Sequence, residues 1–65
     1  MDTYENARAH LINLMDSLFG KPLTESEFVF HDQVLGELEG YMVEDGRLTW
    51  GQIMEIHEQW TPARA

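Results

Sequence analysis

The chain has no cysteine and only two prolines among its 65 residues. Without thiols it can form neither a disulfide framework nor a thiolate zinc site, and it has no cysteine nucleophile. A disulfide-stapled secreted mini-protein and a zinc finger are therefore excluded. A chain of about this length buries only about 60% of its unfolded surface when it folds, so there is room for one small domain and no second one.

Basic residues are scarce as well. Four Lys and Arg stand against twelve Asp and Glu, which gives a net charge of −8 at pH 7. A negative field repels phosphate backbones and anionic lipid head groups. No hydrophobic run is long enough to span a bilayer, and the first residues, Met1 to Glu5, lack the basic start of a signal peptide. We therefore expect a cytoplasmic protein with no direct nucleic-acid binding and no membrane attachment.

The sequence does contain three clear signals for the start of a helix. In each, a short polar residue precedes Glu or Gln by three positions, so that each side chain satisfies a free main-chain amide of the first turn. These pairs are Asp2 and Glu5, Thr24 and Glu27, and Thr49 and Gln52. The second and third pairs are also flanked by apolar residues spaced for a hydrophobic staple, namely Leu23 with Phe28 and Leu48 with Ile53.

These signals predict an all-α fold, a compact three-helix bundle with helices at about 3–19, 25–44 and 50–60. The predicted domain covers residues 1–61, and a frayed C-terminal tail covers 62–65. Gly20 and Pro22 separate the first two helices. An alternative ends the second helix at Gly40 and folds residues 41–50 into a β-hairpin around Asp45-Gly46.

Apolar residues recur at helical spacing in all three segments, and this spacing predicts the core. The first helix presents Tyr4, Ala7, Leu11, Leu14 and Leu18, widened by Ile12, Met15 and Phe19. The second presents Phe28, Leu35, Leu38 and Met42, joined by Phe30, Val34 and Tyr41. The third presents Trp50, Ile53, Met54, Ile56, His57 and Trp60.

Two glycines in the second helix suggest a contact surface. Gly36 and Gly40 lie four residues apart, and each costs about 1 kcal/mol relative to Ala in a helix interior. With Val29 and Val43 they form a stripe about 60° wide, and a stripe of small residues allows another backbone to approach closely. The sequence therefore predicts a dimer contact or a groove for a partner helix here. Alternatively, Gly40 ends the helix and Gly36 is merely tolerated.

Aromatic residues extend this predicted surface. Seven of them provide more aromatic area than so small an interior hides, and interfaces are enriched in such side chains. We therefore predict partner binding by the glycine stripe together with Tyr41, Trp50 and Trp60.

The residues capable of chemistry are few and scattered. His10, His31 and His57 show no pair at the i, i+4 spacing that places two metal ligands on one helical face. We expect half-buried histidines bonded to a carbonyl or a carboxylate, with a metal-linked sensor on His31 and His57 as a minor alternative. The serines and threonines belong to no nucleophile motif. We expect no catalytic site, no metal and no cofactor.

Two functions then compete. The first is a small acidic, non-catalytic protein-binding module that associates with itself as a homodimer or docks on a partner protein. The second is an acidic inhibitor that blocks a basic, nucleic-acid-binding surface of another protein. In its extreme form, such an inhibitor mimics the phosphate array of DNA. In its size, its acidity and its lack of catalytic motifs, the chain resembles small phage-encoded inhibitors of bacterial defence or transcription.

Overall fold

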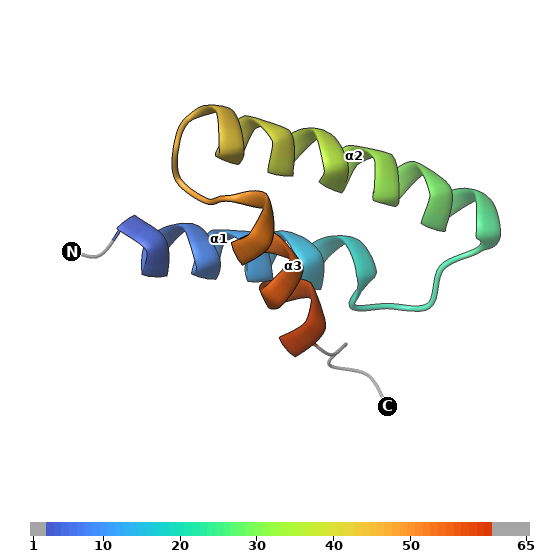
Figure 1. Cartoon of the computed structure of the whole chain (residues 1–65). Coiled ribbons are helices and arrows are strands. Elements are labelled where there is room, and N and C mark those ends of the chain that lie inside the picture. The colour runs from blue at the N-terminus through green and yellow to red at the C-terminus, as the bar shows by residue number, and fades with distance from the viewer. Residues whose placement is uncertain (1–2, 61–65) are drawn as a thin grey trace.

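A computed structural model describes residues 3–60 of the chain and contains three helices in that range, α1 (Thr3–Phe19), α2 (Glu25–Glu44) and α3 (Trp50–Gln59) (Figure 1). The predicted all-α fold with three helices is thus confirmed, and the helix bounds agree with the predicted ones to within a residue. The predicted cap at Asp2 and the predicted frayed tail at 62–65 lie outside the described residues.

The first two helices lie side by side and run in opposite directions, and the short α3 crosses them (Figure 1). Two side-chain contacts fix α3 against both. Trp60, at the end of α3, bonds to Asp16 of α1, and His57 of α3 bonds to Glu39 of α2. The molecule measures 35 × 22 × 17 Å, and its long dimension follows α1 and α2, since a 20-residue helix is about 30 Å long.

Both predicted capping boxes of α2 and α3 are present. The Thr24 hydroxyl accepts from the Glu27 amide at 3.2 Å, and the Glu27 carboxylate accepts from the Thr24 amide at 2.9 Å. Thr49 and Gln52 make the same reciprocal pair at 3.1 and 2.9 Å. The sequence predicts these helix starts correctly because a capping box is local and needs no tertiary contact.

The alternative hairpin at 41–50 is wrong. Tyr41 to Glu44 continue α2, and no strand occurs anywhere in residues 3–60. The helix ends in a Schellman motif, in which Gly46 has φ +75° and its amide donates to Val43 O at 3.0 Å. The Arg47 amide donates to Met42 O at 2.9 Å. Asp45-Gly46 therefore serves as a helix C-terminus, because glycine accepts the left-handed conformation at that position.

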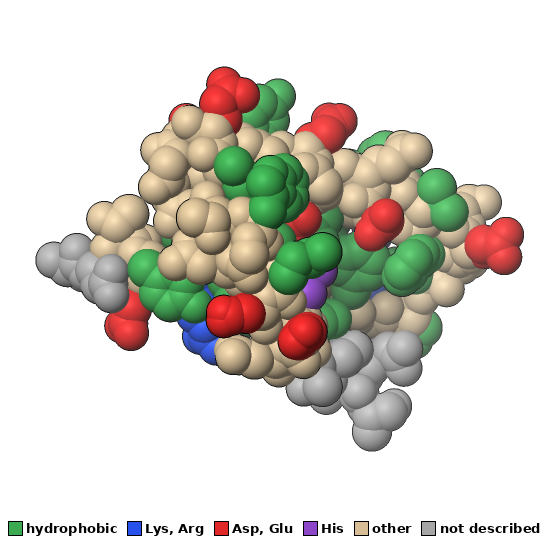
Figure 2. Space-filling model, in the orientation of Figure 1, with side chains coloured by type: hydrophobic (Ala, Val, Ile, Leu, Met, Phe, Trp, Pro, Cys, Tyr) green, Lys and Arg blue, Asp and Glu red, His purple; other side chains and the backbone are tan. Residues whose placement is uncertain are grey.

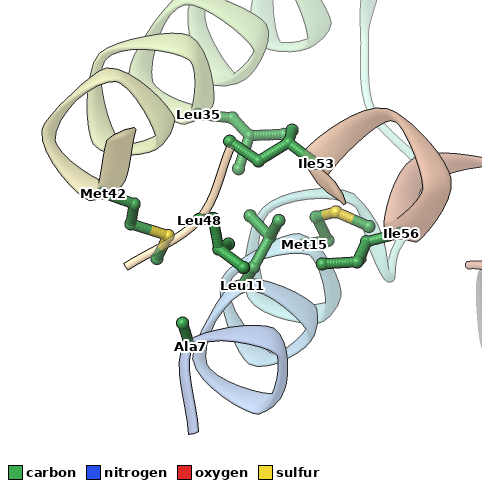
Figure 3. Close-up of a cluster of buried hydrophobic side chains, with 8 residues drawn as sticks. All are labelled: Ala7, Leu11, Met15, Leu35, Met42, Leu48, Ile53 and Ile56. Carbon is green, nitrogen blue, oxygen red and sulfur yellow. The ribbon is translucent and has the colours of Figure 1, made fainter. Parts of the chain in front are cut away.

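A small cluster of apolar side chains from all three helices forms the core (Figure 3). Helix α1 contributes the most, and its stripe is nearly as predicted. The cluster also includes Leu48, which lies between α2 and α3. Its members are Ala7, Leu11, Met15, Leu35, Met42, Leu48, Ile53 and Ile56.

Helices α3 and α2 both depart from the predicted core. In α3, the predicted core residues Trp50 and Met54 are 52% and 63% exposed. In α2 the difference is of the same kind. Leu35 and Met42 are buried as expected, whereas Phe28, Phe30 and Tyr41 of the same predicted arc are 52%, 62% and 63% exposed. The apolar residues of this helix occupy more of its circumference than α1 and α3 can cover. Periodicity alone marks all of them as core candidates, so the predicted arc is too wide.

Candidate protein-binding surface

The predicted glycine stripe runs along one side of α2 and is open. Val29 is 51% exposed, Gly36 is exposed, and Gly40 and Val43 are partly buried. A Cβ atom built on Gly36 or Gly40 meets nothing within 4 Å. No other part of the described chain packs closely against the two glycines. The helix stability that they cost is therefore not offset by a contact within residues 3–60.

The predicted aromatic residues do not all join this stripe. Tyr41 lies about 140° around α2 from Gly36, at about 100° per residue, and so belongs to another face. There it shares a flank with Phe30, about 20° away, and with the partly buried Val34. We call Phe30, Val34 and Tyr41 the aromatic flank of α2.

The two tryptophans also have different surroundings. Trp50 opens α3, is 52% exposed, and lies on one side of that helix with Met54, which is 63% exposed. Trp60 is partly buried and packs against the core. Its indole Nε1–H donates to the Asp16 carboxylate at 2.8 Å. The structure thus divides the predicted interface over separate faces of the molecule.

A cavity opens where the three helices meet, and it includes only Trp60 from the predicted site. Its volume is about 190 Å³, and its wall is formed by Met15, Phe19, Phe28, Asp32, Leu35, His57 and Trp60. The sequence does not reveal this site, because its residues come from three helices. The one available signal is the excess of aromatic residues over what the core holds.

Contacts between α1 and α2 hold one wall of this cavity in place. The rings of Phe19 and Phe28 meet edge to face, with centroids 5.4 Å apart. Phe19 also packs edge to face against His31 at 6.2 Å. His31 Nδ1 lies 2.7 Å from Leu18 O; since a carbonyl only accepts, Nδ1 is the donor. This bond satisfies one of the free carbonyls at the end of α1.

Helix α3 contributes His57 to the cavity wall, and Nε2 of His57 bonds to the carboxylate of Glu39. Glu39 is the one charged side chain buried in the described residues, with 5% of its surface exposed. A buried carboxylate is costly unless it is paired, and His57 supplies the partner. His31 and His57 thus agree with the expectation of histidines bonded to a carbonyl and to a carboxylate.

The charge around the cavity is negative. Asp32 lines the wall, Asp16 holds Trp60, and neither Lys nor Arg is among the lining residues. Arg8 lies toward Gln59, with its guanidinium 3.3 Å from the Gln59 side-chain oxygen, and Arg47 lies beside Asp45. Figure 2 shows one face of the molecule, with scattered carboxylates, hydrophobic side chains exposed between them, and little basic surface.

Two further observations concern the whole described chain. In residues 3–60, no three His, Asp or Glu side chains are grouped so as to hold a metal ion. None of the three described helices combines the length and the apolar character that crossing a bilayer requires.

Comparison with protein-family models, with curated proteins and with solved structures finds no significant match for this chain. Its function has to be inferred from its own surface.

Proposed function

We propose that this chain is a small, acidic, non-catalytic protein-binding module that acts in the cytoplasm by docking on a partner protein. One observation carries the proposal. Six large hydrophobic side chains in the described residues are more than half exposed, against seven in the buried core, where the eighth member is Ala7. They are Phe28, Val29, Phe30, Tyr41, Trp50 and Met54. Aromatic residues and Met are the types enriched in protein interfaces.

The reactive side chains support a binding role over a catalytic one. The hydroxyls of Thr24 and Thr49 are used in capping, and the rings of His31 and His57 are bonded to a carbonyl and a buried carboxylate. A nucleophile requires a base within hydrogen-bond reach. No hydrogen bond joins a serine or threonine to a histidine among the contacts of residues 3–60.

The charge favours docking on another protein over self-association. Two copies with a net charge of −8 each repel one another, whereas a partner with a basic surface is attracted and found quickly. The second candidate, an acidic inhibitor of a nucleic-acid-binding protein, rests on this same charge. In either case the three helices would act as one small bundle that presents its exposed aromatic residues.

Replacing the aromatic flank tests the docking function. The chain is immobilised, a protein is captured from bacterial lysate, and its affinity is then measured after purification. Phe30→Ala with Tyr41→Ala should weaken binding by at least about thirtyfold, since the loss of a single hot-spot aromatic costs about 2 kcal/mol. Gln33→Ala, also exposed on α2, is the matched control. Equal affinity of the double variant and the control would contradict the proposal.

Salt and concentration separate the remaining candidates. Binding that falls steeply as salt rises favours the acidic inhibitor, because exposed charges are screened beyond about 8–10 Å near physiological ionic strength. Light scattering over a range of protein concentrations measures self-association. A dimer that is indifferent to salt and is lost in Gly36→Leu would instead identify the glycine stripe as a self-interface, since a side chain at Gly36 meets open space within one copy.

A further inference from the structure

We infer that the cavity between Phe28, His57 and Trp60 is a socket for a single apolar side chain of a basic partner segment, with the positive charge of that segment beside Asp32. The inference rests on the proposed docking function and specifies the chemistry of the partner. It assigns a binding role to Phe28 and Asp32, which the sequence does not single out for binding.

The size of the cavity fits one side chain. Its volume is about 190 Å³, whereas pockets for small molecules and cofactors measure about 300–1,000 Å³. A dry apolar cavity of about 150 Å³ holds a benzene molecule. The socket therefore has room for one aromatic ring or one branched aliphatic side chain.

The composition of the wall fits an apolar anchor. Five of the seven lining residues are apolar or aromatic, namely Met15, Phe19, Phe28, Leu35 and Trp60. Aromatic pairs and contacts between a methionine sulfur and a ring are both favourable. The wall is also preorganised, because Phe28 rests on Phe19 and Trp60 is held by Asp16. Little ordering is then required on binding, which favours affinity.

The negative charge of Asp32 in the cavity wall favours a positively charged partner residue next to the apolar anchor. Asp32 is an exposed carboxylate that takes part in no hydrogen bond or ion pair with another described residue. The only histidine of the wall, His57, is bonded to the Glu39 carboxylate, so this pair contributes no net positive charge. A Lys or Arg of the partner would pair with the Asp32 carboxylate beside the apolar anchor.

A second copy of this chain is a poorer occupant. Each copy has a net charge of −8, so association would bring like charges together around Asp32. A basic segment of another protein would neutralise that charge.

The first experiment uses two small probes of similar size and opposite charge, phenethylamine and phenylacetate, titrated into the isotope-labelled full chain. The indole N–H signal of Trp60 reports the socket, and that of Trp50, outside the cavity, serves as an internal control. We expect phenethylamine to shift the Trp60 signal and leave Trp50 unchanged. Phenylacetate should bind about tenfold more weakly because of the Asp32 charge.

Two charge variants identify the carboxylate responsible. Asp32→Asn should bring the affinities of the two probes to within about twofold of one another, and Glu37→Gln should retain the tenfold preference. Both residues are exposed on α2, and each substitution removes one negative charge, but Glu37 does not line the cavity. Helix content measured by circular dichroism verifies that both variants are folded.

A peptide arm then tests the proposed source of the ligand. Three helical peptides of about 15 residues are compared: one with a single Phe among Lys residues, the same peptide with Ala in place of Phe, and the same with Glu in place of Lys. The Phe and Lys peptide should displace phenethylamine from the socket. The other two should bind about tenfold or more weakly.

Several outcomes would overturn the inference: no probe shift at Trp60, an equal shift at Trp50, or a preference for phenethylamine that survives Asp32→Asn. Displacement of the probe by raising the concentration of the chain itself would also overturn it, by identifying a second copy as the occupant. None of these results affects the test of the docking function, which measures the aromatic flank of α2 with Phe30 and Tyr41.

Discussion

The buried carboxylate of Glu39 on α2 is bonded to the exposed edge of α3 through Nε2 of His57. This pair joins two helices that are adjacent in sequence, and its imidazole forms part of the wall of the proposed socket. The two side chains differ in exposure, with 7% of the Glu39 side chain and 39% of the His57 side chain accessible to solvent. The imidazole is therefore the hydrogen-bond partner of a carboxylate that has little access to water.

Removing the imidazole should therefore cost stability. We expect His57→Ala to lower the free energy of unfolding by about 1–3 kcal/mol, since it leaves a buried acceptor without its partner. In a Glu39→Gln background the same change should cost less, because no charge is left unpaired. Urea unfolding of the native chain, the two single variants and the double variant gives the coupling energy, expected at about 0.5 kcal/mol or more. Strictly additive effects would show that the pair contributes nothing beyond its separate members.

The core is small enough that a single truncation should unfold the chain. Leu11 is fully buried, and Leu→Ala at such a site costs about 2–5 kcal/mol. A domain of this size rarely has more than about 3–5 kcal/mol in total. We expect Leu11→Ala to be largely unfolded by circular dichroism, and Ile53→Val to remain folded with a loss of about 0.5–1.5 kcal/mol. A cooperative thermal transition in Leu11→Ala close to that of the native chain would show that the core is not centred on this residue.

Two glycine substitutions should have opposite effects. An alanine Cβ at Gly36 meets open space inside α2, so Gly36→Ala should stabilise the chain by up to about 1 kcal/mol. Gly46 has φ +75° at the end of the same helix, so Gly46→Ala should destabilise it by about 1–2 kcal/mol. Thermal melts of both variants provide the comparison. A loss of stability in Gly36→Ala would mean that another group packs against Gly36 in solution.

The capping box of α3 should contribute measurably to stability because this helix is only ten residues long. Isolated helices of fewer than about 12 residues are marginal in water. Thr49→Ala removes the acceptor for the Gln52 amide and should cost about 1 kcal/mol. Thr49→Ser keeps that acceptor and is the matched control, with urea midpoints as the measurement. If both variants are equally destabilised, the hydroxyl is not the cause.

The capping box of α2 predicts a dependence of stability on pH. Hydrogen bonds from the Thr24 backbone and side chain hold the pKa of Glu27 below its ordinary value. The stabilisation from this lowered pKa is fully present above the ordinary glutamate pKa of about 4.3. It is lost as the pH falls through the lowered pKa.

Glu27→Gln keeps the hydrogen bond and removes the titration. The difference in urea midpoint between the native chain and Glu27→Gln should therefore be largest near neutral pH and should shrink as the solution is made acidic. The other carboxylates titrate in both proteins and cancel in the difference. A difference that grows with acidity would have the wrong sign and would contradict the role assigned to the Glu27 charge.

The sequence by itself determined the local features of this protein. The capping boxes at Thr24 and Thr49, the end of α1 at Gly20 and the amphipathic stripe of α1 all depend on residues within one or two helical turns. A Cβ atom at position 20 would collide with the carbonyl oxygen of Asp16. This explains why a glycine stands where α1 ends. The turn at Asp45-Gly46 was ambiguous from sequence, because the same dipeptide suits a hairpin and a helix C-terminus.

Only the tertiary structure decided which apolar residues of α2 are covered. Leu35 is buried and Phe30 is exposed although both belong to the same predicted arc, because α1 and α3 reach only part of the circumference of α2. The burial of Glu39 likewise depends on His57, which is 18 residues away along the chain. The socket combines side chains from three helices, and no local pattern encodes their meeting, since it is set by how the helices cross.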